Sequence, residues 1–424
     1  MSKRNTKRSI IVYADWDGLE TPQLMGVLFT ELLRGKEIFS FEYDNGWLNS
    51  DNAQLLDPDL QLYAGLHYLN DDIKTNFGLF LDSSPDRWGR ILMRRREAAM
   101  ARLEERKEQN LFETDYLLGV YDGHRMGALR FKLEIDGPFL NDNKELASPP
   151  WTSIRELEQI SLRLEDEDVV NDPEYLNWLN MLVAPGSSLG GARPKASVVD
   201  TDNNLWIAKF PSQNDISDIG GWEIVTYELA LLAGIDMANS QAKKFTSNYH
   251  TFLTKRFDRD ENGNRIHFAS AMTLLGYTDG QDYTDGVSYL ELVEFISNNG
   301  SNAESDLKQL WRRIVFSICV SNTDDHLRNH GFILTNKGWI LSPAYDINPV
   351  ERGTGLKLNI SENDNALDLN LVLEVSTYFR LENDEAVNII NEVKQAVSNW
   401  KIVANKLGIS RAEQELKAKV FLTN

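Results

Sequence analysis

The most informative part of the sequence is the stretch Asn322-Thr323-Asp324-Asp325-His326-Leu327-Arg328-Asn329. Asp324 and Asn329 have the spacing of the aspartate and the asparagine in a kinase catalytic loop. In such a loop the aspartate accepts the proton of the substrate hydroxyl, and the asparagine binds a magnesium ion. The stretch therefore predicts a phosphotransfer site in which Asp324 is the base and Asn329 is a metal ligand.

A kinase site also needs a second metal-binding aspartate, on a segment that returns to the catalytic loop. Residues 332–334 and 339–341 have the pattern of two short strands, joined by the turn residues Asn336-Lys337-Gly338. Such a hairpin carries the chain away from Asn329 and brings it back at Ser342-Pro343-Ala344-Tyr345-Asp346. Asp346 is therefore the predicted second metal ligand.

Composition limits the class of protein. A chain of 424 residues with 42% hydrophobic residues and ten tryptophans can form two or three domains, each with its own core. The formal charge of −20 opposes broad binding to nucleic-acid backbones, which depends mostly on lysine and arginine. The one cysteine, Cys319, lies in an apolar run, so an internal disulfide is excluded. No signal peptide or membrane span is recognisable, and we expect a cytoplasmic protein.

The N-terminal part is predicted to be rich in β-strands. Short apolar runs at residues 10–14, 25–30 and 38–43 alternate with turn residues. Residues 90–109 have the pattern of a surface helix. Residues 116–121 and 126–132 are predicted to form another strand pair, turned at Asp122-Gly123. Residues 139–150, rich in Asn, Pro and Ser, are the best linker candidate.

A glycine-rich loop follows a helix predicted around residues 154–165. It reads Pro185-Gly186-Ser187-Ser188-Leu189-Gly190-Gly191-Ala192-Arg193-Pro194-Lys195. Small residues let backbone N–H groups approach a phosphate closely. The loop alone is weak evidence because it lacks the Gly-Lys-Ser or Gly-Lys-Thr ending of a Walker A loop. Two predicted strands after it, at residues 196–199 and 205–210, strengthen the interpretation, because a lysine on a strand after a phosphate loop is a kinase arrangement.

Lys209 is that lysine. It stands between Ala208 and Phe210, so its ammonium group must reach solvent or find an anion. A helix is predicted at residues 221–233, and Glu223 in its first turn can pair with Lys209 as the corresponding residues do in protein kinases. Glu228 is the alternative partner, and the simplest reading is that either acid only supports the helix N-terminus.

A predicted strand at residues 251–259 would connect two kinase lobes and meet the adenine. Together with the preceding segments it resembles the HipA family of bacterial toxin kinases over most of the chain. The most specific stretches are Gly190-Gly191-Ala192-Arg193-Pro194-Lys195, Trp206-Ile207-Ala208-Lys209-Phe210-Pro211, Arg256-Phe257-Asp258-Arg259, the Asp324 to Asn329 loop and the segment that ends at Asp346. Ser84-Pro85-Asp86-Arg87-Trp88-Gly89-Arg90 is a further similar stretch.

The resemblance implies a two-lobed, protein-kinase-like α+β fold with a small β-rich N-terminal domain and a mainly helical C-terminal lobe. The expected domains are residues 1–149, 150–265 and 266–424. It also implies ATP and Mg²⁺ as cofactors, with Asp324, Asn329, Asp346 and Lys209 as the catalytic group. The implied nucleotide-binding residues are Ser188, Leu189, Gly190, Gly191, Ala192, Lys195, Lys209, Lys255, Phe257, His326, Asn329 and Asp346.

The resemblance also implies regulation and partners. Ser188 stands where the family carries a serine whose autophosphorylation ejects the loop, and Ser187 beside it is the alternative. Lys255 departs from the acidic residue of the best-known member. Family members are neutralised by a helix-turn-helix antitoxin, and operator DNA is reached through it. The protein substrate stays open, with an aminoacyl-tRNA synthetase as one candidate. The arginines at positions 87, 90 and 94–96 can contact DNA or simply pair with Glu97 and Glu104.

Two other functions are compatible with parts of the sequence. The segment Asp15-Trp16-Asp17-Gly18 is similar to the nucleophile loop of haloacid-dehalogenase-type phosphatases, but it lacks the expected threonine and leaves Lys209 unexplained. The other alternative is a catalytically idle kinase scaffold that binds an antitoxin. Within the catalytic loop, Asp325 is interpreted as a supporting residue and His326 as an orienting one.

Overall fold

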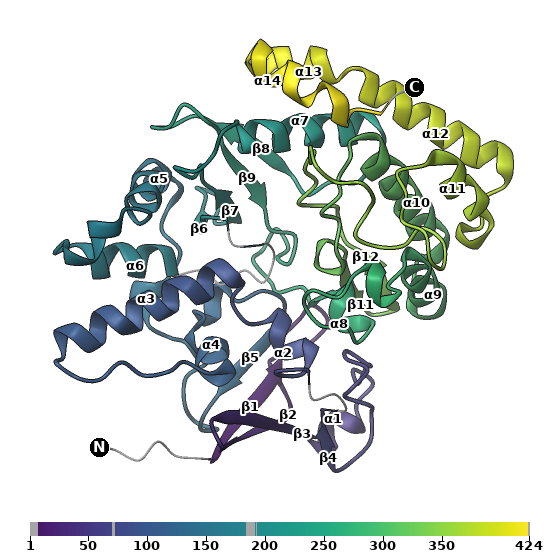
Figure 1. The fold of residues 1–424 in the computed structure, drawn as a ribbon. Coiled ribbons are helices and arrows are strands. Elements are labelled where there is room, and N and C mark those ends of the chain that lie inside the picture. Colours follow the sequence, from purple (N-terminus) through teal and green to yellow (C-terminus); the bar gives the residue numbers. More distant parts are fainter. Residues whose placement is uncertain (1–6, 70–72, 184–190, 192, 423–424) are drawn as a thin grey trace. The chain divides into compact units, whose positions relative to one another are not determined.

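The computed structural model describes residues 7–69, 73–183, 191 and 193–422 (Figure 1). The chain forms two compact units. Unit 1 comprises residues 1–208 and 258–278, and unit 2 comprises residues 209–257 and 279–424. The predicted boundaries near residues 150 and 266 thus differ from this division, and the three-domain organisation stays a prediction.

Unit 1 combines a β-sheet with short helices. Its strands are β1 (Lys7–Ala14), β2 (Gln23–Leu33), β3 (Lys36–Tyr43), β4 (Leu66–Tyr68), β5 (Leu129–Lys132), β6 (Lys195–Val199), most of β7 (Leu205–Lys209) and β10 (Phe268–Ser270). Its α-helices are α1 (Asn45–Leu48), α2 (Gly78–Asp82), α3 (Arg87–Leu103), α4 (Glu113–Gly119), α5 (Ile154–Arg163), α6 (Tyr175–Val183) and α8 (Ala271–Leu274). Its 3-10 turns are η1 (Asp122–His124), η2 (Lys144–Leu146), η3 (Trp151–Ser153) and η4 (Glu167–Asn171).

The main sheet of unit 1 has five strands in the order β4-β3-β2-β1-β5. Neighbouring strands β1 and β2 are antiparallel, with Ile10 opposite Leu28. The alternation of buried and partly exposed residues along β1 and β3 places one face of the sheet on the core. The predicted N-terminal strands are therefore confirmed.

One predicted strand is a helix. Residues 116–121 were expected to pair with residues 126–132, but the chain forms α4 there, and β5 pairs with β1 instead. The helix N-terminus explains the difference, because the Asp115 carboxylate accepts a hydrogen bond from the Phe112 N–H at 2.9 Å. Glu113 and Asp115 in the first turn also favour a helix start. Short apolar runs do not distinguish strand from helix by themselves.

Residues 258–278 return to unit 1 and are bound there by buried polar groups. Asp82 accepts hydrogen bonds from the backbone N–H of Ser270 at 2.7 Å and from its hydroxyl at 2.8 Å. Asp258 accepts one from the N–H of Gly127 at 2.8 Å. The predicted strand at residues 251–259 therefore ends early, since β9 stops at Lys255 and Asp258 already belongs to unit 1.

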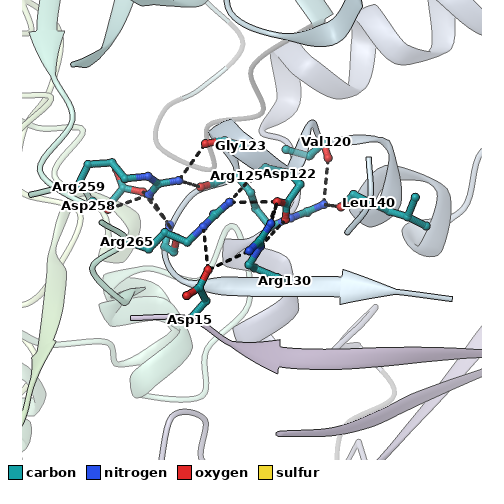
Figure 2. Close-up of polar contacts among 11 residues, drawn as sticks. Asp15, Val120, Asp122, Gly123, Arg125, Arg130, Leu140, Asp258, Arg259 and Arg265 are labelled. Carbon is teal, nitrogen blue, oxygen red and sulfur yellow. Dashed lines mark hydrogen bonds and ion pairs between the residues drawn. The ribbon is translucent and has the colours of Figure 1, made fainter. Parts of the chain in front are cut away.

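Four arginines of unit 1, Arg125, Arg130, Arg259 and Arg265, form a cluster with nearby acids and backbone carbonyls (Figure 2). The fully buried Arg125 donates to the carbonyl oxygens of Ser83, Leu117, Val120 and Leu140 at 2.7–3.0 Å. Burial lowers the pKa of Arg125 to about 10. Because arginine carries five donors in a planar fork, this one side chain can donate to four backbone carbonyls at helix ends and in loops.

His267 is a second buried group in unit 1. Its ring lies 5.1 Å from that of Trp16, and burial lowers its pKa to about 3. Below about pH 6.5 the His267 imidazole binds a proton in the unfolded chain but not in the folded unit. The free energy of unfolding therefore falls as the pH drops from about 6.5 toward about 3, by up to about 1.4 kcal/mol per pH unit.

We therefore expect the melting temperature of the wild type to fall more steeply between about pH 6.5 and pH 4.5 than that of His267→Gln. Calorimetry of both full-length proteins at matched pH values is the measurement. Other titrating groups, such as the buried Asp57, are common to both proteins and cancel in the difference. Parallel curves would contradict the prediction.

Unit 2 is mainly helical. Its α-helices are α7 (Ile219–Leu232), α9 (Tyr289–Asn299), α10 (Ala303–Cys319), α11 (Leu369–Glu374), α12 (Asn383–Ser398), α13 (Trp400–Lys406) and α14 (Arg411–Lys417). Its strands are β8 (Ser240–Lys243), β9 (Thr251–Lys255), β11 (Gly331–Thr335) and β12 (Gly338–Leu341). Its 3-10 turns are η5 (Tyr283–Asp285), η6 (Leu327–Asn329), η7 (Ser376–Phe379) and η8 (Ala418–Val420). None of the helices in the described part of the chain is long and apolar enough to cross a membrane.

Two antiparallel hairpins position the site segments of unit 2. In the first, β8 pairs with β9, with Gln241 opposite Leu253. In the second, β11 pairs with β12, with Phe332 opposite Leu341. The second hairpin is the predicted one, and its turn contains Gly338 at a φ of 122°, which favours glycine.

Candidate active site

Lys209 lies between two carboxylates in unit 2. Its Nζ donates to Glu223 Oε1 and to Asp346 Oδ1, each at 2.6 Å. The predicted pairing with Glu223 is therefore present, while the alternative partner Glu228 binds Lys406 at 3.0 Å. Asp346 as a second partner was not predicted. The three side chains come from the end of β7, the fifth residue of α7 and the segment after β12.

The charge of Lys209 is secured by these partners. Burial by itself would lower the pKa of the ammonium group, but Asp346 and Glu223 outweigh it and the pKa is raised. The ring of Phe252 adds a cation–π contact, with its centroid 5.6 Å from Nζ. The buried lysine is thus held as a cation.

Helix α7 is fixed at the end that carries Glu223. Its N-cap residue Asp218 accepts hydrogen bonds from the backbone N–H groups of Gly221 at 2.9 Å and His250 at 2.8 Å. The Thr226 hydroxyl donates to the carbonyl of Ile347 at 2.7 Å, which ties α7 to the residue after Asp346. These contacts keep the carboxylates of Glu223 and Asp346 on either side of Lys209.

The predicted catalytic loop forms a compact turn. His326 N–H donates to the Asp324 carbonyl at 2.9 Å, and Asn329 Nδ2 donates to the same oxygen at 3.1 Å. The side chain of Asn329 is buried, whereas Asp324 is exposed. The loop thus presents the Asp324 carboxylate to solvent while its backbone is held from inside.

Asp325 supports this loop from the core. Its fully buried carboxylate accepts from the Tyr289 hydroxyl at 2.6 Å and lies 3.1 Å from His330 Nε2. Burial would raise the pKa of Asp325, but His330 and Tyr289 outweigh it and the pKa is lowered. Tyr289 and His330 were missed by sequence reasoning, because no local signal links a tyrosine on α9 to a loop 36 residues away.

Asp346 has an unusual backbone conformation. Its φ is 57°, which is uncommon for a residue other than glycine, and such positions cluster at functional sites. Its Oδ1 also accepts from Asn348 Nδ2 at 3.2 Å. Among the described residues, the buried Oδ1 of Asn348 has no hydrogen-bond partner. Across all the residues that the structure describes, no group of three or more His, Cys, Asp or Glu side chains is placed so that it could hold a metal ion.

The end of the glycine-rich loop lies in unit 1. Lys195 Nζ binds the buried Asp86 carboxylate at 2.7 Å and the Gly191 carbonyl at 2.8 Å, and the Trp88 indole donates to the Lys195 carbonyl at 3.0 Å. Sequence reasoning placed Lys195 on the nucleotide and missed Asp86. The predicted site residues Ser187, Ser188, Leu189, Gly190 and Ala192 lie outside the described residues.

Lys255 and Phe257 lie at the end of β9 in unit 2. The backbone N–H of Lys255 donates to the Asn239 carbonyl at 2.7 Å. The ring of Phe257 lies 5.6 Å from that of Tyr345, the residue before Asp346. Phe257 and Tyr345 are therefore neighbours, as the predicted adenine and metal segments of a kinase are expected to be.

Three arginines of α3, at positions 90, 95 and 96, are engaged within unit 1. Arg90 forms a bidentate pair with Glu113 at 2.6 and 2.7 Å, Arg95 donates to the Leu164 carbonyl at 2.8 Å, and Arg96 donates to Asn180 at 2.7 Å. The expected partner Glu97 binds Arg106 instead. These contacts favour the structural interpretation of the run over a DNA contact.

Asp15, the first acid of the phosphatase-like segment, belongs to the arginine cluster. Its carboxylate lies 3.1 Å from Arg130 and 3.7 Å from Arg265 (Figure 2). Both arginines also approach Asp122. These ion pairs give Asp15 a structural role within unit 1.

The family model described as "HipA-like C-terminal domain" matches residues 187–400. The "Putative kinase" of Haemophilus influenzae is 26% identical over 179 residues, which are 38% of this chain and 52% of that protein. The "Serine/threonine-protein kinase toxin HipA" of Shewanella oneidensis is 27% identical over 149 residues, 30% of this chain and 34% of that protein. The chain thus spans about half, or less, of the length of the curated relatives it matches.

A solved structure is similar over nearly the whole chain. It is the complex of Shewanella oneidensis HipA, HipB and operator DNA, with a TM-score of 0.66, 17% identity, and coverage of 98% of this chain and 95% of that chain. At this identity the similarity shows the fold. It confirms the predicted α+β, kinase-like fold of the HipA type.

Proposed function

Because this chain belongs to the HipA family, we propose that it is an ATP- and Mg²⁺-dependent kinase that phosphorylates a serine or threonine of a protein. The observation that carries the proposal is the placement of Lys209 between Glu223 and Asp346 at 2.6 Å from each. A lysine paired with a glutamate of the following helix is a requirement of kinase chemistry. An idle scaffold has no need to hold a buried lysine between two carboxylates.

Asp324 is the proposed general base. Its exposed carboxylate can reach a substrate hydroxyl, and the buried Asp325 holds the loop that presents it. Removal of a positioned base typically slows a reaction by about 10²- to 10⁴-fold. Lys209 neutralises phosphate charge, and Glu223 keeps the ammonium group in place.

Asn329 and Asp346 are the proposed magnesium ligands. Mg²⁺ prefers oxygen donors, and the residues around Asp346 fit this preference, since the Oδ1 of Asn348 is a buried oxygen without a hydrogen-bond partner among the described residues. When bound, the ion would neutralise phosphate oxygens. Asp346 and Asn329 would hold it there and so help to orient the nucleotide.

The glycine-rich loop is proposed to bind phosphates through the N–H groups of residues 188–192. Phosphorylation of Ser188, or of Ser187, is proposed to switch the kinase off, because an added phosphate brings close to two negative charges into a phosphate site. Lys195 differs from its predicted role in that its ammonium group already binds Asp86. We therefore assign Lys195 to holding the end of the loop.

The proposed partners follow from the family. The Shewanella HipA is solved with HipB and operator DNA. By analogy, we propose that this cytoplasmic protein forms a toxin–antitoxin pair with a helix-turn-helix antitoxin and reaches DNA through it. The α3 arginines are already engaged, which supports indirect DNA contact. An aminoacyl-tRNA synthetase is the first substrate to try.

The test is phosphate transfer by the purified protein. Intact mass and phosphopeptide mapping after incubation with ATP and Mg²⁺ are compared for the wild type, Asp324→Asn, and Asp384→Asn as an exposed control on α12. We expect phosphate on Ser187 or Ser188 in the wild type and the control, and a loss of at least about a hundredfold in Asp324→Asn.

Phosphate present before ATP is added would show silencing during expression, and the assay would be repeated after phosphatase treatment. Absence of phosphate on all three proteins after that treatment, together with absence of nucleotide binding, would favour the scaffold function.

A further inference from the structure

We propose that the C-terminal segment of residues 411–422 is a clasp that holds the three segments of the candidate site in place. Glu413 and Lys417 are its positioning residues. The inference rests on the proposed function and adds residues that no motif indicated. All of the contacts involved lie within unit 2, and the clasp follows the last residue, 400, that the family model matches.

The first contact of the clasp is with α7. Glu413 Oε2 accepts hydrogen bonds from the backbone N–H of Asp218 at 3.0 Å and from the Trp222 indole at 3.2 Å. Trp222 directly precedes Glu223. A carboxylate at the start of a helix is favoured by the helix dipole, so Glu413 stabilises the end of α7 that carries the partner of Lys209.

An aromatic cluster strengthens this contact. The rings of Trp400 and Phe421 are stacked, with centroids 4.6 Å apart and planes 12° apart. Trp222 packs against both, at 6.3 and 6.0 Å. All three side chains are buried. Figure 1 shows α13 and α14, in yellow, beside α7. Through this cluster, Trp400 at the start of α13 and Phe421 in the clasp both pack against Trp222, the residue next to Glu223.

The second contact is with the segment after Asp346. The buried Lys417 donates to the carbonyl of Pro349 at 2.9 Å and forms an ion pair with Glu351 at 3.1 Å. A lysine is rarely buried unless its ammonium group is paired, so this contact fixes its position. Pro349 is three residues from Asp346, and its place limits how far the Asp346 carboxylate can move from Lys209.

The third contact is with the chain that leads into the catalytic loop. The Ser321 hydroxyl donates to the Val420 carbonyl at 2.8 Å, and the Leu422 N–H donates to the Cys319 carbonyl at 2.7 Å. Ser321 has a φ of 51° and stands three residues before Asp324. The Val350 N–H also donates to the Ser321 carbonyl at 3.1 Å. The clasp thus contacts the segments of Glu223, Asp346 and Asp324.

The test compares a double variant, Glu413→Ala with Lys417→Met, with a matched control, Glu415→Ala with Lys419→Met. The control removes the same charges from exposed positions of the same segment. We expect the clasp variant to lose at least about tenfold in phosphate-transfer rate, because small displacements of catalytic groups are costly. Its backbone amides at residues 219–226, 321–329 and 346–351 should exchange hydrogen faster, and the control should match the wild type.

Rescue distinguishes positioning from general stability. Glu413→Gln keeps a hydrogen-bond acceptor and Lys417→Arg keeps a charged donor, and we expect this conservative pair to restore both the rate and the exchange pattern. Equal exchange in the clasp variant and the control would overturn the proposal, as would faster exchange spread evenly over unit 2. A wild type without phosphate transfer would refute the proposed function, while the exchange comparison would still decide whether the clasp holds the three segments.

Discussion

Replacing Lys209 with methionine is expected to reduce phosphate transfer by about a thousandfold, the upper range for losing one preorganised charge on a phosphoryl group. It is also expected to destabilise unit 2 by about 3 kcal/mol, because Glu223 and Asp346 then lose the cation that separates them. Rates from phosphopeptide quantification and unfolding in urea measure the two effects.

A second variant separates chemistry from stability. In Lys209→Met with Glu223→Gln, one of the two facing carboxylates is gone, so we expect more than half of the lost stability to return. The phosphate-transfer rate should stay low, because the ammonium group is still absent. A double variant that is no more stable than the single one would show that repulsion between Glu223 and Asp346 is not the cause.

Replacing Arg125 with methionine is expected to destabilise unit 1 by about 4 kcal/mol, since each of the four carbonyl oxygens that lose their donor costs about 1 kcal/mol. Methionine fills much of the space but leaves the carbonyl oxygens of Ser83, Leu117, Val120 and Leu140 without this donor. Arg94→Met on the exposed face of α3 is the matched control and should change stability by less than about 0.5 kcal/mol.

Hydrogen exchange localises the effect of the Arg125 change. Amides of α4 and of residues near Leu140 should lose protection before those of unit 2. Equal unfolding midpoints in urea for Arg125→Met and Arg94→Met would contradict the prediction. So would an effect confined to unit 2, since the contacts of Arg125 lie in unit 1.

The parts of the site that sequence could predict are those specified by local pattern. The β11–β12 hairpin follows from a glycine turn between two apolar runs, and the chain that leaves it carries Asp346. The pairing of Lys209 with Glu223 follows from a strand followed by a helix with an acid near its start, although the helix begins at Ile219, two residues earlier than predicted. In both cases a few neighbouring residues determine the geometry.

The unpredicted parts depend on contacts between distant residues. Asp346 as a second partner of Lys209 joins residues 137 positions apart, and Lys195 with Asp86 joins residues 109 apart. Glu413 reaches Asp218 across 195 positions. No periodicity or turn signal encodes such pairs. The helix α4 was mistaken for a strand for another reason, since its apolar run suits both structures and the acids at its start decide between them.

The division of the chain into units has a consequence for synthesis on the ribosome. Unit 1 includes residues 258–278, which supply Ser270 to Asp82 and Arg265 to Asp122. Domains generally fold as they emerge, N-terminal part first. Here these contacts cannot form until Arg265 and Ser270 have left the ribosome, so residues 209–257, including the lysine of the site and its glutamate partner, emerge before unit 1 is complete. For a time the nascent chain therefore carries unit 1 and unit 2 both incompletely folded. The predicted catalytic loop at residues 322–329 is synthesised only after all residues of unit 1.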